Sequence, residues 1–173
     1  MFDVYHFVPH NLTGNILYPL NVLKDKHPDL YAAHARKYQG RQHLMTTKMP
    51  ILDCLWNDVL HFSPVHPGTI RDALIKTGHR WQSTCWFVIN TKTCNFTADN
   101  SIFYFPGKTP SWRHFKPFDT GKIAGMRNLT EETITYYEQC ARDNKRPLLF
   151  AHIPHILYKG NIQLDIADRI QVD

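Results

Sequence analysis

The sequence lacks the features that most readily assign a chain to a class of protein. Its four cysteines form no C-x-x-C pair, which argues against both a disulfide framework and a zinc ribbon. It has no Walker A loop, G-x-G-x-x-G, G-x-S-x-G or H-E-x-x-H motif, so most kinases, dehydrogenases and zinc proteases are disfavoured. No run reaches the roughly 18 apolar residues of a membrane span, and the first residues have neither the basic region nor the apolar stretch of a secretory signal. We therefore expect a cytoplasmic protein with no membrane partner.

The composition that is present is typical of one globular domain. Hydrophobic residues make up 43% and charged residues 20% of the 173 positions, and no repeat, low-complexity tract or linker divides them. The formal net charge is +5 with the eleven histidines neutral. A basic balance favours an anionic partner such as nucleic acid, although a solvated basic surface without a partner would give the same charge. We expect a single domain over residues 1–173.

The local patterns mix strands and helices without regular alternation. Strands are expected at residues 3–8, 59–62, 84–90, 101–105, 148–152, 161–164 and 169–172. Helices are expected at residues 28–40, 69–76 and 128–142, and a long loop at residues 106–127. The sequence therefore predicts an α+β fold with mixed or antiparallel central sheets and a few helices.

The first cluster of candidate functional residues ends the first expected strand. It consists of Tyr5 and His6, followed by Asn11. A histidine that faces a pocket offers one hydrogen-bond donor and one acceptor, which suits ribose hydroxyls or an amide. The alternative is a core histidine that is bonded to the backbone.

The second cluster is the basic and aromatic end of the helix expected at residues 28–40. It runs from Lys37 to His43 and contains Arg41. An arginine can hold a pyrophosphate with two parallel hydrogen bonds, which a lysine does less well. The alternative is a solvated helix end whose cations offset the negative end of the helix dipole.

The third cluster interleaves polar residues with bulky apolar ones over residues 54–67. Asn57, Asp58 and His61 lie within an apolar run that ends in a proline turn, with His66 just beyond it. Polar groups in such a run need partners, which either the protein or a ligand supplies. His61 and His66 also form a candidate acid and base pair for a metal-independent ribonuclease.

Two further histidines, His152 and His155, have H-x-x-H spacing. On a strand that ends at Pro154 this spacing places them on opposite faces or around a turn. A metal ion needs more ligands than these two, and nothing nearby in the sequence supplies them. No metal site is expected.

The clusters together resemble the DarT-like DNA ADP-ribosyltransferases, toxins that use NAD to modify bases in DNA. The resemblance rests on the Tyr-His strand and the Asn-Leu turn in residues 4–17, the basic stretch 37–41, the Asn-Asp run 57–64 and the closing segment 146–172. It implies an ADP-ribosyltransferase-like fold, NAD as a substrate, and nucleic acid as a partner, with DNA favoured over RNA.

The resemblance also implies roles for individual residues. His6, Asn11, Tyr5 and Asn57 are expected to bind NAD, and Arg41 to act on its pyrophosphate and on the acceptor. Asp58 and His61 are expected to take part in catalysis with Arg41.

The sequence departs from the family pattern at one position that matters for catalysis. Cleavage of the glycosidic bond places positive charge on the ribose, which a nearby carboxylate stabilises. The family has a glutamate on a late strand, whereas residues 147–151 here contain no acid. Either Asp58 takes its place, or the alignment of this segment is shifted, or the protein binds NAD without transferring ADP-ribose.

A third reading is a nucleic-acid-binding module without enzymatic activity. It would use the basic residues of the expected long loop, which are Lys108, Arg113, His114 and Lys116. Aromatic residues beside basic ones suit RNA as well as DNA.

Overall fold

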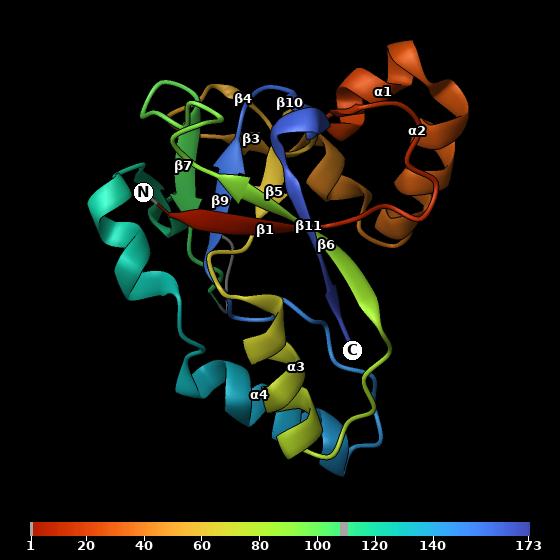
Figure 1. Ribbon diagram of the computed structural model, residues 1–173, viewed down its shortest axis with the longest axis vertical. Coiled ribbons are helices and arrows are strands. Elements are labelled where there is room, and N and C mark those ends of the chain that lie inside the picture. The colour runs from red at the N-terminus through yellow and green to blue at the C-terminus, as the bar shows by residue number, and fades with distance from the viewer. Residues whose placement is uncertain (1, 108–110) are drawn as a thin grey trace.

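Two antiparallel sheets form the centre of the computed structural model, which describes residues 2–107 and 111–173 (Figure 1). The first sheet has the order β1–β6–β11 and consists of β1 (Asp3–Phe7), β6 (Thr84–Asn90) and β11 (Asp168–Val172). The second has the order β5–β9–β7–β8 and consists of β5 (Leu60–Phe62), β9 (His155–Tyr158), β7 (Ser101–Tyr104) and β8 (Phe115–Pro117). A bridge between Tyr5 and Ser63 links β1 of the first sheet to the segment that follows β5 of the second.

Two short strand pairs complete the β structure of the described residues. β2 (Ile16–Leu17) pairs with β10 (Ile162–Gln163), and β3 (Lys48–Met49) pairs with β4 (Cys54–Leu55). The first pair brings the segment after β1 close to the segment before β11.

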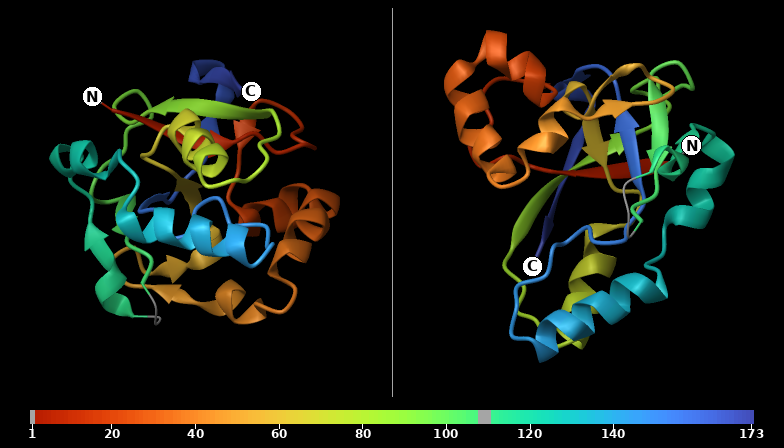
Figure 2. Two further views of the ribbon diagram at one scale, coloured as in Figure 1. Left: turned by 90° about the horizontal axis from the view of Figure 1, so that it is seen from below. Right: turned by 180° about the vertical axis from the view of Figure 1, so that it is seen from behind.

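The helices lie in two separate groups. α1 (Leu20–Lys26) and α2 (Pro28–Ala35) lie beside the strands, whereas α3 (Pro67–Lys76) and α4 (Glu131–Arg142) lie together below them (Figures 1 and 2). Short 3₁₀ helices connect the elements, and their bounds are η1 (Arg36–Tyr38), η2 (Gln42–Thr46), η3 (Trp56–Asp58), η4 (Trp112–His114), η5 (Thr120–Met126) and η6 (Leu164–Ile166).

The main core fills the space between the two sheets. Phe62, Phe87 and Phe103 are at most 1% exposed and belong to one cluster with Val4 and Ile156. Burial of each phenylalanine side chain contributes about 1.5–3 kcal/mol. The opposite face of the first sheet carries a smaller cluster that includes Tyr5, Trp86 and Val172. Neighbouring residues of β1 therefore face opposite sides of the sheet, as the pleat of a strand requires.

Much of the predicted fold is confirmed. The class is α+β, every described strand pair is antiparallel, and β6 has the bounds expected from its aromatic and β-branched residues. α3 begins at Pro67, slightly before the expected start, because proline suits the first helical position. α4 begins after Thr130, whose hydroxyl accepts a hydrogen bond from the Thr133 N–H, and not at Asn128.

Other expectations about the elements were wrong. Residues 148–152 form turns, with His152 at a φ of 60°, and the strand of this region is β9. The helix expected over residues 28–40 ends at Ala35 and continues only as η1. α1 was not predicted, and the long loop expected at 106–127 contains β8, η4 and η5. Lys108 lies outside the described residues.

Within the described part of the chain, no helix has both the length and the apolar character that crossing a bilayer would require.

Candidate functional site

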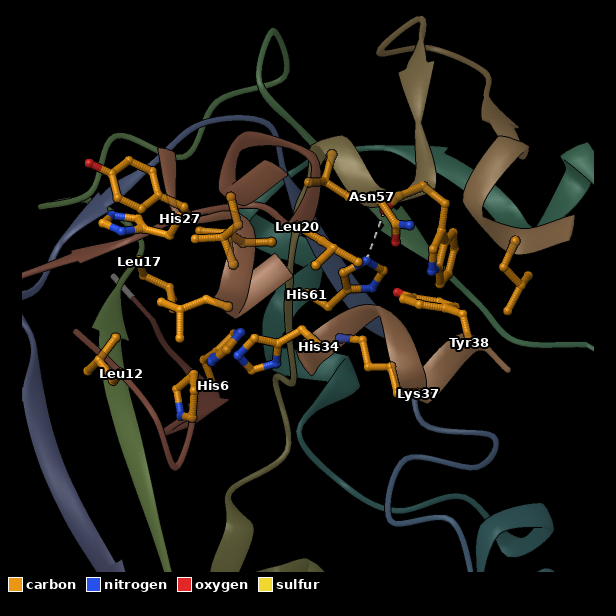
Figure 3. Close-up of a pocket in the computed structure, with 18 of the residues that line it drawn as sticks. His6, Leu12, Leu17, Leu20, His27, His34, Lys37, Tyr38, Asn57 and His61 are labelled. Carbon is orange, nitrogen blue, oxygen red and sulfur yellow. Dashed lines mark hydrogen bonds between the residues drawn. The ribbon is translucent and has the colours of Figure 1, made fainter. Parts of the chain in front are cut away.

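A cavity of about 420 Å³ lies between the helical pair α1–α2 and the strands β1 and β5. We name it the histidine pocket after its polar lining, which includes His6, His34, His61, His155, Lys37 and Arg41. Figure 3 shows the side chain of His34 near that of His6, and the side chain of Lys37 extending below the ring of His61. Leucine, isoleucine and aromatic side chains form most of the remaining wall. None of the described residues that line this pocket is acidic.

The imidazoles of His6, His61 and His155 are neutral at pH 7. Burial lowers the pKa of His6 to about 4 and that of His155 to about 4. Burial and the neighbouring His155 lower the pKa of His61 to about 3. Burial also lowers the pKa of His34, and the positive charge of Lys37 adds to the effect.

Hydrogen bonds to the backbone fix which ring nitrogen of two histidines carries the proton. His6 Nδ1 lies 2.7 Å from the Phe7 carbonyl oxygen, and His61 Nε2 lies 3.2 Å from the Trp56 carbonyl oxygen. Because a carbonyl only accepts, these nitrogens donate, and the other nitrogen of each ring is left as an acceptor. Two neutral rings with defined acceptors suit hydroxyl groups of a ligand.

The cations Lys37 and Arg41 lie on η1 and at the turn that follows it. Gly40 has a φ of 77°, a left-handed conformation that reverses the chain directly before Arg41. One guanidinium nitrogen of Arg41 donates to the Lys37 carbonyl oxygen at 2.8 Å, so the residue also caps the helix end. The other donors of this exposed side chain remain available to a ligand. Burial, and then the nearby Arg41, lower the pKa of Lys37.

The amide of Asn57 is the most unusual group in the pocket. Asn57 is 1% exposed and lines the pocket, yet neither Oδ1 nor Nδ2 of its side chain has a hydrogen-bond partner within the described structure. A buried polar group left without a partner costs about 1–3 kcal/mol. This arrangement is expected where a ligand completes the hydrogen bonds.

Asp58 holds the segment that carries Asn57. Its Oδ2 accepts from the Leu55 N–H at 2.7 Å, and its Oδ1 accepts from Asn21 Nδ2 at 2.7 Å. These bonds join η3 to α1 and so fix the position of the Asn57 backbone beside the pocket. Trp56 packs beside it, with its ring 4.6 Å from that of His61.

The structure brings together four of the seven residues expected at the site. His6, Arg41, Asn57 and His61 all line the histidine pocket, although they come from separate parts of the chain. The other three do not line it, as set out next.

Tyr5, Asn11 and Asp58 lie outside the pocket lining for identifiable reasons. Tyr5 faces away from His6 on β1 and packs near Trp86. Asn11 is exposed in the loop after β1, where only its neighbours reach the pocket. Both carboxylate oxygens of Asp58 accept the bonds described above, which leaves this acid in a structural position.

The rival readings find less support in the geometry. His66 lies at the start of α3, where its Nδ1 accepts from the Gly68 N–H at 3.0 Å, and it does not line the pocket with His61. The ring near His61 is instead that of His155, with centroids 6.3 Å apart. With pKa values near 3 and 4, neither ring is in the imidazolium form that a general acid requires near pH 7. Of the basic loop residues, Arg113 and His114 lie in η4 and Lys116 lies in β8.

His34 is a lining residue that the sequence interpretation missed. It precedes Lys37 by three residues, and this spacing places both on one helix face. His155 also lines the pocket, whereas its H-x-x-H spacing with His152 had suggested only a metal ligand. In the described residues no three or more histidine, cysteine or acidic side chains gather in a way that could hold a metal ion.

Comparison with known proteins gives no further assignment, because the chain matches no family model, no curated protein and no solved structure.

Proposed function

We propose that the chain binds NAD in the histidine pocket and acts on nucleic acid as an ADP-ribosyltransferase-like protein, with DNA as the expected partner. The observation that carries the proposal is the unpartnered amide of Asn57 in a cavity that also holds Arg41 and neutral histidines. This set of groups matches the parts of a dinucleotide.

Each kind of group has a counterpart in NAD. The guanidinium of Arg41 suits the pyrophosphate, to which it can donate two parallel hydrogen bonds. The free ring acceptors of His6 and His61 suit ribose hydroxyls. The Asn57 amide offers a donor beside an acceptor, and NAD presents the complementary edge twice, in its carboxamide and in its adenine.

The lining favours binding over bond cleavage. In ADP-ribosyl transfer the bond from the ribose to nicotinamide breaks, and nicotinamide leaves as a neutral molecule with the bonding electrons. The acceptor base then bonds to the ribose C1′ and loses a proton to solvent. Positive charge develops on the ribose, but the described lining provides two cations and no carboxylate to stabilise it. We therefore expect NAD to bind well and to be transferred slowly.

Addition of NAD is expected to raise the melting temperature. At a concentration of about 100 times Kd the stabilisation is about 2.7 kcal/mol, and each kcal/mol shifts the midpoint by roughly 2–4 °C in a protein of this size. Differential scanning fluorimetry measures the shift, and incubation with radiolabelled NAD and a single-stranded oligonucleotide measures transfer. The same measurement with ADP-ribose alone and with nicotinamide alone shows which end of NAD the protein binds. The absence of any shift with NAD and ADP-ribose would contradict the proposal.

Substitution Arg41→Ala is expected to abolish labelling of the oligonucleotide and to weaken NAD binding at least tenfold. The side chain is exposed and loses one hydrogen bond to the backbone, so the fold should lose only about 1 kcal/mol. Arg36→Ala is the matched control, since Arg36 is an exposed cation of η1 that does not line the pocket. Calorimetry on both variants gives the comparison. Equal affinities in the two variants would remove Arg41 from the site.

A further inference from the structure

A second hollow, of about 1130 Å³, lies where the chain enters β6 and leaves α4. We name it the basic groove and define it by Phe7, Arg80, Trp81, Lys145, Arg146 and Phe150. The two segments that form it run side by side near the C-terminus (Figure 2). The groove shares Pro9 and Phe150 with the histidine pocket, so the two hollows adjoin.

The charge of the groove has one sign. Its described lining contains Arg80, Lys145 and Arg146 and no aspartate or glutamate. Lys145 lies 3.3 Å from the carboxylate of Asp143, just outside the lining. The two arginines are exposed, and the described residues supply no salt bridge to either of them. Two unneutralised arginines therefore face solvent at the same hollow.

The aromatic side chains of the groove are held in place from behind. Trp81 donates its ring N–H to the Val172 carbonyl oxygen at 3.0 Å. Phe7 and Phe150 both contact the buried ring of Trp86 edge-on, at centroid distances of 5.4 and 5.8 Å. All three rings are only partly buried, so each keeps some surface exposed. Fixed rings beside cations form the kind of surface on which unpaired bases stack.

We propose that the basic groove binds a single-stranded nucleic acid, with phosphates on Arg80 and Arg146 and bases against the aromatic rings. A duplex would present its phosphates but not its base faces, so the rings favour a single strand. The shared wall at Phe150 leads the strand towards the histidine pocket. This inference rests on the proposed function, because the bound nucleic-acid strand would supply the acceptor base. Binding of the strand itself requires no NAD.

The test compares two charge-matched double variants in the absence of NAD. Fluorescence anisotropy follows a labelled oligonucleotide of roughly 12 nucleotides, as DNA and as RNA, over a range of salt concentrations. Arg80→Ala with Arg146→Ala is expected to weaken binding at least tenfold and to reduce the salt slope by about 1.4, or about 0.7 for each lost phosphate contact. Lys92→Ala with Lys122→Ala removes the same charge from positions that do not line the groove, and is expected to change binding little.

Each outcome of this experiment decides the proposal. A selective loss in the arginine variant supports the groove, and the preferred oligonucleotide identifies the partner as DNA or RNA. An equal loss in both double variants would show that net charge alone drives binding, and this would overturn the proposal. Equal affinity for a duplex of the same sequence would overturn it as well. The NAD-induced melting shift of the arginine variant is measured in parallel. Its retention is expected, and its absence in the wild-type protein would count against the proposed function without affecting the groove.

Discussion

Lowering the pH from 7 to 5 is expected to reduce the free energy of unfolding by several kcal/mol, because of three histidines in the pocket. The folded chain holds the pKa of His6 and His155 near 4 and that of His61 near 3, against an ordinary value of 6.5. Between these values the unfolded chain binds protons that the folded chain does not. Stability is therefore complete above pH 6.5 and falls as the pH drops towards the folded pKa values.

The size of this effect follows from the width of the pH interval. One pH unit corresponds to about 1.4 kcal/mol for each group that stays neutral in the folded state. Between pH 6.5 and pH 5 each histidine thus loses about 2 kcal/mol, and the three together about 6 kcal/mol. This is a large part of the roughly 5–15 kcal/mol that stabilises a typical domain.

Urea unfolding followed by tryptophan fluorescence at pH 7.5, 6 and 5 measures the loss. Each of the variants His6→Gln, His61→Gln and His155→Gln is expected to remove about a third of the pH dependence, because glutamine does not titrate. His43→Gln changes an exposed histidine outside the pocket and is the matched control for the substitution itself. An unfolding free energy that stays constant from pH 7.5 to pH 5 would show that these imidazoles are solvated and would undermine the description of the pocket.

The substitution Asn57→Leu is expected to have opposite effects on stability and on binding. Leucine has the same branching as asparagine but carries no polar atoms, so it removes a buried amide that lacks partners. The free protein should gain about 1–3 kcal/mol, which corresponds to roughly 2–4 °C in melting temperature for each kcal/mol. NAD affinity should fall at least tenfold, because the ligand loses the hydrogen bonds that the amide would provide.

Asn100→Leu is the matched control for this substitution. Both polar atoms of the Asn100 side chain have partners, and its Oδ1 accepts from the Thr97 N–H at 2.9 Å and from the Ser101 hydroxyl at 2.8 Å. Its Nδ2 donates to the Asn95 carbonyl oxygen at 2.9 Å. Loss of these bonds is expected to destabilise the protein by about 2–3 kcal/mol without affecting NAD binding. A loss of stability in Asn57→Leu as well would show that the Asn57 amide is already satisfied in the free protein, and would remove it from ligand recognition.

The contrast between correct and incorrect predictions has a physical pattern. β6 could be predicted to the residue because its aromatic and β-branched side chains are buried on both faces of the first sheet. The run at residues 148–152 is also apolar but contains no β-branched residue. His152 adopts a left-handed backbone and Pro154 follows, so pairing is delayed to β9. α1 has only seven residues and no side-chain cap, which left no sequence signal for its start.

Part of the lining of the histidine pocket could also be predicted from the sequence. His6, Asn57 and His61 were identified from polar residues in apolar surroundings, and this criterion reflects burial beside a cavity. Arg41, which is exposed, was identified from the basic end of a helix. The alternation of a strand was enough to show that Tyr5 and His6 could not both face one pocket. The position of Asp58 could not be predicted, since it depends on contacts with α1, which has no sequence signal of its own.

The ring of Phe150 belongs to the walls of both hollows, and this has a thermodynamic consequence. If a nucleic-acid strand reorients the ring so that NAD affinity changes by some factor, NAD must change the affinity for the strand by the same factor. The binding of the two ligands is then thermodynamically coupled without any movement of the sheets. The position of one aromatic side chain determines whether the cooperativity is positive or negative.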